Sequence, residues 1–237
     1  MDSPDLAFGR FENRRAAGEA VASMLPEFAG RPNVTVLGLP RGGVVIAAVI
    51  ARRLAAPLDA LGVRKLGHPR QPELAIGAIA TGGILVMDPG AGLGGVSATD
   101  RARVIARERV ELDRRERVYR RGRPALDLRG RTAILADDGL ATGATMRAAI
   151  LAAWRLGARE VVVGVPVGHA ASLDVLVRPP YRASVRCALR VAALQSISQH
   201  YVAFGQVSDD EVCALMAAAQ PSENVHVQAG QRPESNS

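Results

Sequence analysis

The sequence has few aromatic residues, two cysteines and a single lysine, and these shortages exclude several classes of site. Cys187 and Cys213 are too few for a disulfide framework and both fall in apolar surroundings, so we interpret them as small buried side chains. Lys65 is the only lysine and no Gly-Lys pair occurs, which excludes a nucleotide P-loop. The four scattered histidines form no metal-ligand cluster with the cysteines.

Long hydrophobic runs are also missing. The longest apolar run, residues 42–51, is well short of the roughly 20 residues that a membrane helix needs, and two arginines follow it. The first five residues are acidic and lack both a basic start and an apolar stretch, so they do not resemble a secretory signal. We therefore expect a cytoplasmic protein with no membrane partner.

The chain is nevertheless long and apolar enough for a sizeable core. It has 237 residues, of which 48% are hydrophobic and 22% charged, as in ordinary globular proteins. We expect residues 1–219 to form a single domain. The remainder, 220–237, is polar enough to be a disordered tail.

Apolar periodicity alternates between strand-like and helix-like segments along the chain. This order predicts an α/β fold with a mostly parallel central sheet and crossover helices on both faces. The expected strands cover 34–39, 58–66, 75–80, 84–87, 132–136, 160–165 and 183–189. The expected helices cover 11–28, 42–54, a long segment after Ser97 or Thr99, 145–156, 170–177 and 209–219, with a polar loop at 67–73 and irregular chain at 195–206.

The net charge of +7 is concentrated in one segment. Residues 101–123 contain ten arginines against four acidic residues, so the rest of the chain is nearly neutral. Apolar residues recur there at helical spacing, which predicts a long helix with an apolar seam at Ala102, Ile105, Leu112 and Tyr119. We interpret its charged side as a solvated face or an oligomer contact, with binding of RNA or DNA as the alternative.

Residues 134–145 carry the most informative pattern. An apolar strand delivers Asp137 and Asp138 to its carboxyl end, where open α/β sheets bind their ligands. Small residues and two threonines follow and lead directly into a helix, so backbone amides and the helix N-terminus form an anion site. Two carboxylates beside an anion site suit a sugar phosphate.

This segment resembles the signature of the type I phosphoribosyltransferases, an apolar strand with two acids and a small Thr- and Gly-containing loop. The resemblance implies that family's fold, with a small hood built from the chain ends, and transfer of a 5-phosphoribosyl group from 5-phosphoribosyl 1-diphosphate (PRPP) to a nitrogen acceptor. Asp137 and Asp138 would bind the ribose hydroxyls as catalytic groups. The ribose and 5-phosphate site would comprise these two acids with Gly139, Ala141, Thr142, Gly143, Ala144 and Thr145. Mg²⁺ would arrive with PRPP, with Asp137 and Asp138 as candidate ligands.

Two further segments would bind the pyrophosphate. Pro40, Arg41 and Gly42 resemble the family's pyrophosphate loop, in which Arg41 faces the leaving group and the peptide before it has an unusual geometry. Lys65 lies where family members often carry a basic residue beside a mobile loop, so the resemblance implies a catalytic contact to the leaving group, with Arg64 structural.

The acceptor is harder to predict. Family members that use 6-oxopurines usually carry an acid where this chain has Ala141, so the loop looks nearer to the adenine type without establishing adenine. Tyr201 and Phe204 would either stack on an acceptor base or pack the last helix onto the domain. A regulator that keeps the ligand site but binds nucleic acid through 101–123 is the rival hypothesis, and we expect a homo-oligomer in either case.

Residues 90–95 match the dinucleotide fingerprint GxGxxG. Pro89 interrupts the exit of the preceding strand, and the candidate helix caps lie beyond the last glycine. We therefore predict no dinucleotide site there.

Overall fold

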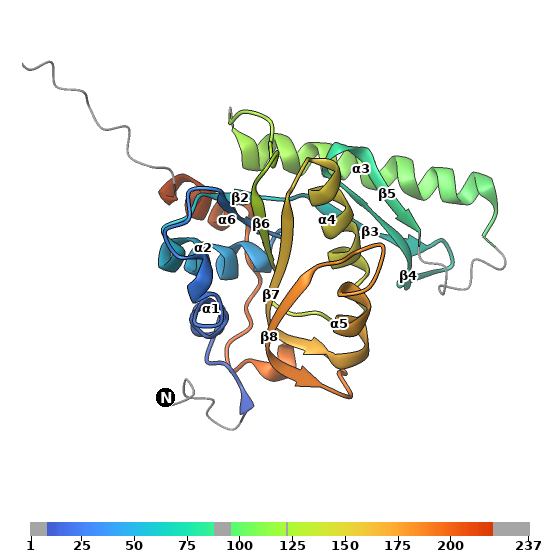
Figure 1. Cartoon of the computed structure of the whole chain (residues 1–237). Coiled ribbons are helices and arrows are strands. Elements are labelled where there is room, and N and C mark those ends of the chain that lie inside the picture. The colour runs from blue at the N-terminus through green and yellow to red at the C-terminus, as the bar shows by residue number, and fades with distance from the viewer. Residues whose placement is uncertain (1–8, 88–95, 122, 220–237) are drawn as a thin grey trace, which may run out of the picture.

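The centre of the molecule is a five-stranded sheet with the order β2-β1-β6-β7-β8 (Figure 1). The structure is a computed structural model and describes residues 9–87, 96–121 and 123–219. All neighbouring strands of this sheet pair in parallel, which confirms the expected fold class. The strands are β1 (Val34–Gly38), β2 (Leu58–Ala60), β6 (Thr132–Ala136), β7 (Glu160–His169) and β8 (Ser184–Val191).

Helices cover both faces of this sheet, as Figure 1 shows. One face carries α1 (Arg14–Ala22), α2 (Gly42–Leu54) and α6 (Asp209–Ala218), and the other carries α4 (Ala144–Arg155) and α5 (Ala170–Leu176). Side chains alternate between the two faces: Val36 and Ile134 join the core beneath α1 and α2, whereas Leu37 and Leu135 join the core beneath α4. Because both faces are buried, the central strands are mostly apolar.

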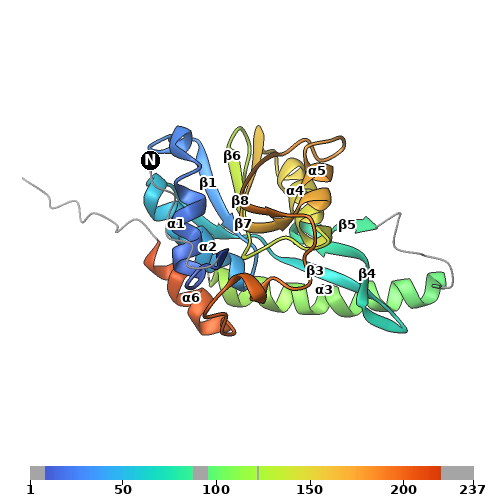
Figure 2. The same ribbon diagram turned by 90° about the horizontal axis from the view of Figure 1, so that it is seen from below.

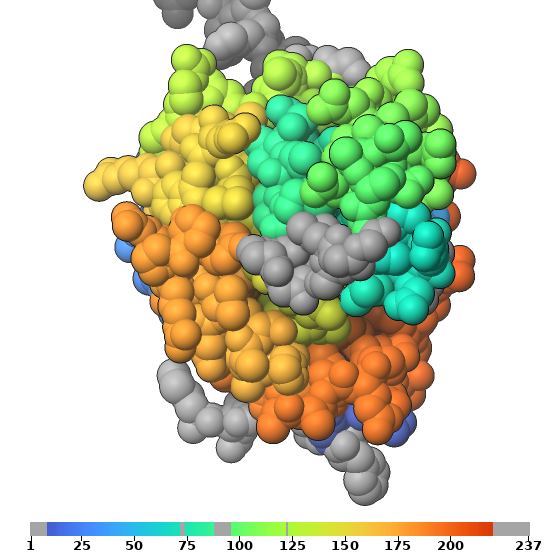
Figure 3. Space-filling view, turned by 90° about the vertical axis from the view of Figure 1, so that its right-hand side faces the viewer, coloured from blue at the N-terminus to red at the C-terminus, as the bar shows by residue number. Residues whose placement is uncertain are grey.

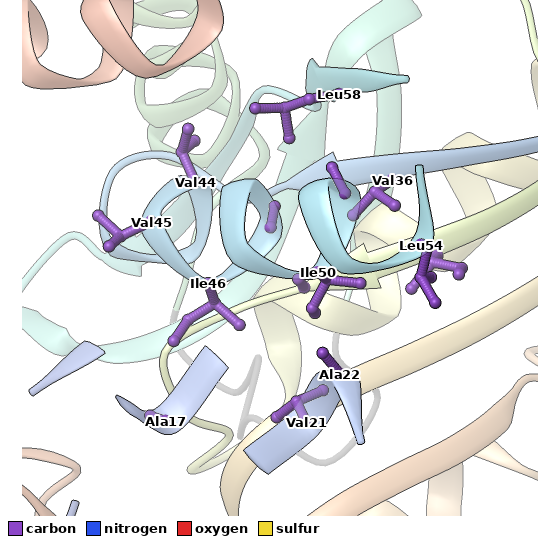
Figure 4. Close-up of a cluster of buried hydrophobic side chains, with 14 of the residues drawn as sticks. Ala17, Val21, Ala22, Val36, Val44, Val45, Ile46, Ile50, Leu54 and Leu58 are labelled. Atoms are coloured by element: carbon purple, nitrogen blue, oxygen red, sulfur yellow. The ribbon is translucent and has the colours of Figure 1, made fainter. Parts of the chain in front are cut away.

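The first described helix, α1, packs on α2 (Figure 4). Val21 of α1 lies against Ile46 and Ile50 of α2, and all three are fully buried. A Cβ on Gly18 would stand 2.8 Å from Cβ of Val49, so the helices approach closely at this glycine. Each large apolar side chain buried here contributes about 1.5–3 kcal/mol, and α1 is held firmly as a result.

A second, antiparallel sheet of order β3-β4-β5 lies between two helices (Figure 2). Its strands are β3 (Val63–His68), β4 (Gln71–Ala80) and β5 (Ile84–Met87). One face packs on α3 (Ala98–Arg120) and the other on α4. Figure 3 views this side of the molecule, with α3 in green, α4 in yellow and the region of α5 and β8 in orange.

The prediction of one strand over 58–66 was wrong. The segment forms β2 and β3, which belong to different sheets. The chain turns between them at Gly62, where a Cβ would stand 2.7 Å from Cδ1 of Leu112. The Gly62 amide donates to Oγ1 of Thr81 at 3.0 Å, which holds this turn.

The predicted polar loop at 67–73 was also wrong. β3 extends to His68 and β4 begins at Gln71, so the two strands form a tight hairpin, with register shifts on either side of Gly67. The amide of Arg70 donates to Nδ1 of His68 at 3.1 Å across the turn. Composition alone suggested a loop because these residues are polar. Antiparallel pairing nevertheless satisfies their backbone hydrogen bonds.

Two helices differ from expectation in extent or orientation. The helix expected over 11–28 ends at Ala22, and Pro26 begins a separate 3₁₀ turn. In α3 the cap is Ser97, whose hydroxyl accepts from the Asp100 amide. The buried seam consists of Val104, Glu108, Leu112 and Tyr119, while Ala102 is exposed.

The 209–219 helix is confirmed as α6. The fingerprint at 90–95 and the tail at 220–237 lie outside the described residues.

Candidate active site

The two predicted acidic residues follow β6 at the carboxyl edge of the parallel sheet. Both are half-buried, and the Asp138 amide donates to Oδ1 of Asp137 at 2.9 Å. Burial raises the pKa of Asp137 well above its usual range, and the charge of Asp138 raises it further. Burial also raises the pKa of Asp138, against a lowering by the nearby Arg14 guanidinium. Ionising both carboxyl groups is therefore unfavourable in this environment, a property typical of functional sites.

The segment after β1 lies directly against this acid pair. A Cβ on Gly42 would stand 1.9 Å from Oδ2 of Asp138, and one on Gly43 would stand 2.5 Å from the Ala136 carbonyl oxygen. Only glycine allows this approach. The Pro40–Arg41 peptide is cis, so the unusual geometry expected at this turn is confirmed. The Arg41 guanidinium lies 3.9 Å from Oδ1 of Asp209 at the start of α6.

The small-residue loop after the acids is anchored on the neighbouring strand. The Leu140 amide donates to the Val167 carbonyl and the His169 amide donates to the Leu140 carbonyl, at 2.9 and 2.8 Å. Ala141 and Thr142 beyond this anchor are exposed. Gly143 has φ of 74°, a left-handed conformation that favours glycine.

The loop leads into the N-terminus of α4. The helix begins at Ala144, and its N-cap Gly143 makes no side-chain cap hydrogen bond. Thr142 Oγ1 lies 3.5 Å from the Ala144 amide nitrogen, at the outer limit of a hydrogen bond. Amides in the first turn of a twelve-residue helix are suited to bind an anion. Ala144 is buried and Thr145 is half-buried, and the phosphate contacts predicted for this loop stay predictions.

The two basic residues of β3 have different surroundings. Arg64 donates to Glu108 of α3 through Nε and Nη2, at 2.9 and 2.7 Å, a contact that joins β3 to α3 and agrees with the structural role expected for it. Lys65 is exposed and pairs in register with Ala78, which packs in the core on the α4 side of this sheet. Because side chains alternate along a strand, Lys65 lies on the α4 face, the side opposite Arg64. Its contact with a leaving group stays a prediction.

The aromatic residues of the expected hood pack beside the acid pair. Tyr201 is 3% exposed, and its hydroxyl donates to the Asp138 carbonyl at 2.6 Å. Its ring lies 5.7 Å from Phe11 and 4.8 Å from the half-buried Phe204. The structure thus favours packing over base stacking for Tyr201, because a buried ring offers no face to an acceptor.

The sequence-based prediction missed Arg14, which comes from the opposite end of the chain. Arg14 Nε donates to Oδ2 of Asp138 at 2.8 Å. A partly buried acid pair needs a cation, and that requirement was visible in the sequence. Its identity was not, because 124 residues separate the partners.

The arginine-rich segment forms α3, and acidic residues pair with many of its guanidinium groups. Arg103 pairs with Asp100, Arg114 and Arg115 with Glu111, Arg107 with Glu108, and Arg120 with Asp59. This agrees with a largely self-paired, solvated face.

Comparison with known proteins identifies the family. The phosphoribosyl transferase domain model matches residues 10–186, so the chain belongs to the type I phosphoribosyltransferases, a family of pentosyltransferase enzymes. A Mycobacterium tuberculosis CDC 1551 protein, MT0597, which carries the name of a phosphoribosyl transferase, is 42% identical over 213 residues, or 88% of this chain and 47% of its own length. Rv0571c of strain H37Rv gives the same values. The chain thus spans about half the length of these curated relatives.

A solved structure covers nearly the whole chain. TT1426 from Thermus thermophilus is 40% identical, with a TM-score of 0.74 over 90% of this chain and 100% of that one. The fold described above is therefore shared along the full length of that protein. Separately, none of the helices that the structure describes has the length and apolar character to cross a membrane.

Proposed function

We propose that the chain transfers the 5-phosphoribosyl group of PRPP to a nitrogen acceptor and releases pyrophosphate. The bond between C1 of the ribose and the pyrophosphate oxygen breaks, and the oxygen keeps the electron pair. A nitrogen lone pair of the acceptor forms the new bond to C1. The released proton of the acceptor passes to solvent or to the pyrophosphate.

One observation carries this proposal: the acid pair, the start of α2 at Gly42 and the N-terminus of α4 meet at the same edge of the parallel sheet. Gly42 abuts the Asp138 carboxylate, and the loop after Asp138 leads into α4 within six residues. A sugar phosphate needs acceptors for its hydroxyls and donors for its phosphates within a few ångströms of each other. This edge offers both.

The acid pair suits the ribose. Ionised carboxylates accept hydrogen bonds from hydroxyl groups, and Asp137 and Asp138 would bind the 2- and 3-hydroxyls. Positive charge develops on the sugar as the pyrophosphate leaves, and nearby negative charge would stabilise it. The loop from Gly139 to Thr145 would hold the 5-phosphate and so fix the sugar in position.

The leaving group requires positive charge. Arg41 and the exposed Lys65 would supply it, and Mg²⁺ carried with PRPP would add positive charge there. In the part of the chain that the structure describes, no three His, Cys, Asp or Glu side chains group to hold a metal. We therefore propose that Mg²⁺ enters with PRPP, with Asp137 and Asp138 as the nearest carboxylates.

The acceptor is a small molecule with a nucleophilic nitrogen. Ala141 places no carboxylate where 6-oxopurine members of the family carry one, which argues against that class. Phe204 is the half-buried aromatic residue of the two predicted for the acceptor hood. Nucleobases, adenine among them, are the first acceptors to test.

The test is release of pyrophosphate from PRPP, measured with and without Mg²⁺ against a panel of nucleobases and simple amines. We expect release that depends on Mg²⁺ and on one acceptor class. Equal rates for the native chain and Asp138→Asn would refute the proposal, because any release would then arise elsewhere.

A further inference from the structure

Arg14 makes the closest ion pair to the candidate site. Its Nε lies 2.8 Å from Oδ2 of Asp138, and the two side chains are 12% and 19% exposed. Arg14 is the first residue of α1, and Asn13 caps that helix. A cation is unfavourable at a helix N-terminus, so helix stability does not explain arginine at this position. The Asp138 carboxylate does.

Arg14 also contacts the segment from residue 195 to residue 208, which we call the strap. Its Nη1 donates to the Gly205 carbonyl at 2.7 Å, and its guanidinium carbon lies 3.8 Å from the centre of the Phe204 ring. The planar guanidinium thus uses one edge for Asp138, another for the strap backbone, and a face for an aromatic ring.

The strap contacts the acid motif at two further points. The Tyr201 hydroxyl donates to the Asp138 carbonyl at 2.6 Å. A Cβ on Gly139 would stand 2.5 Å from Cδ1 of Ile197, so the strap lies directly on the loop after the acids. Among these contacts, the one made by Arg14 involves the side-chain carboxylate of Asp138, whereas Tyr201 bonds its backbone carbonyl.

We infer that Arg14 is a positioning residue that fixes the orientation of the Asp138 carboxylate and joins it to the strap. The part of this inference that concerns PRPP binding rests on the proposed function. A carboxylate has room for several donors, so Arg14 and a ribose hydroxyl can share Asp138. Without Arg14, Asp138 would be free to rotate and would carry a partly buried charge without its partner.

The first experiment measures the affinity for Mg²⁺-loaded PRPP by calorimetry. We expect Arg14→Gln to weaken binding about tenfold, the cost typical of losing one charge-assisted contact. Arg15→Gln is the matched control: Arg15 is exposed, carries the same charge on the same helical turn, and should bind within twofold of the native chain. Native affinity in Arg14→Gln would overturn the inference.

Arg14→Lys separates charge from geometry. Lysine keeps the charge but cannot reproduce the planar fork that reaches both Asp138 and Gly205, so we expect affinity between those of the native chain and Arg14→Gln. This variant decides the case if Arg14→Gln does not fold: binding at least threefold weaker than native supports the inference, and native binding overturns it.

A second readout does not depend on PRPP. Hydrogen exchange of peptides from the strap should rise in Arg14→Gln and stay at the native level in Arg15→Gln. Because Arg14 and Asp138 act on each other, adding Asp138→Ala to Arg14→Gln should raise exchange little further. Unchanged exchange in Arg14→Gln, or fully additive effects, would overturn the link. If the native chain fails to bind PRPP while the exchange results hold, the proposed function falls and the link between Arg14 and the strap stands.

Discussion

Gly42 lies directly against the carboxylate of Asp138, with no room for a side chain between them. A Cβ on Gly42 would stand 1.9 Å from the Asp138 carboxylate oxygen and 2.9 Å from Nε of Arg14. The turn after β1 and the acids after β6 come from neighbouring parallel strands, so their separation is set by the sheet. Glycine at 42 lets the turn and the carboxylate occupy this narrow space together.

Gly42→Ala should therefore damage the site more than the fold. The added methyl group must push the Asp138 side chain aside, and we expect turnover to fall more than tenfold with a stability loss of roughly 1–3 kcal/mol. Steady-state kinetics and urea unfolding measure the two effects. Gly205→Ala is the control, because its Cβ would meet nothing within 4 Å. Native turnover in Gly42→Ala would show that the carboxylate position is unimportant.

Asp138→Asn and Lys65→Ala should each reduce turnover by more than tenfold and leave the fold intact. The first removes a charge that would stabilise the developing cation, and the second removes a charge that would bind the leaving group. Pyrophosphate release reports turnover, and circular dichroism reports the fold. Unchanged turnover in a well-folded variant would refute the role of that residue.

Asp137→Asn should stabilise the protein near neutral pH. Because the pKa of Asp137 is raised in the folded state, its contribution to stability is fully present below the unfolded value of about 3.8 and is lost as the pH rises through the folded value. At neutral pH the buried native acid therefore lowers the free energy of unfolding. Asparagine avoids this cost and still accepts a hydrogen bond from the Asp138 amide. Thermal unfolding from pH 4 to pH 8 should show the advantage of the variant growing with pH, and an advantage that shrinks as pH rises would contradict the assigned direction.

Glu108→Gln should destabilise the chain by roughly 2 kcal/mol, because it weakens a partly buried ion pair. The Glu108 side chain is 9% exposed and Arg64 is 28% exposed, so solvent screens the pair only in part. Glu19→Gln provides the comparison, since Glu19 pairs with Arg52 on the surface and should cost less than about 1 kcal/mol. Urea denaturation distinguishes the two, and equal costs would argue that the α3 contact adds little.

Local patterns in the sequence predicted the parallel part of the fold and the acid motif. Residues 132–145 contain their strand, acids, loop and helix in one continuous stretch, so the prediction needed no distant contact. The same reasoning failed at 58–66, where a strand-like pattern hid the turn at Gly62, which packs against Leu112 of α3. Local pattern does not show which sheet a strand will join.

Ion pairs between residues far apart in the chain were the second feature that the sequence did not predict. The ion pairs of Asp138 with Arg14 and of Arg64 with Glu108 join residues 124 and 44 positions apart, and no periodicity connects them. Glu108 lies on the buried seam of α3, where charge is expected least. Only the folded arrangement shows that Arg64 is its partner. The predicted seam was right at Leu112 and Tyr119 and wrong at Ala102, which is exposed.

A crystal structure of the chain with Mg²⁺ and PRPP bound would show whether the acid pair holds the sugar. We expect the ribose hydroxyls against Asp137 and Asp138, the 5-phosphate at the amides from Ala141 to Thr145, and the pyrophosphate beside Arg41. A sugar phosphate bound at another place, with no contact to Asp137 or Asp138, would contradict the proposed function.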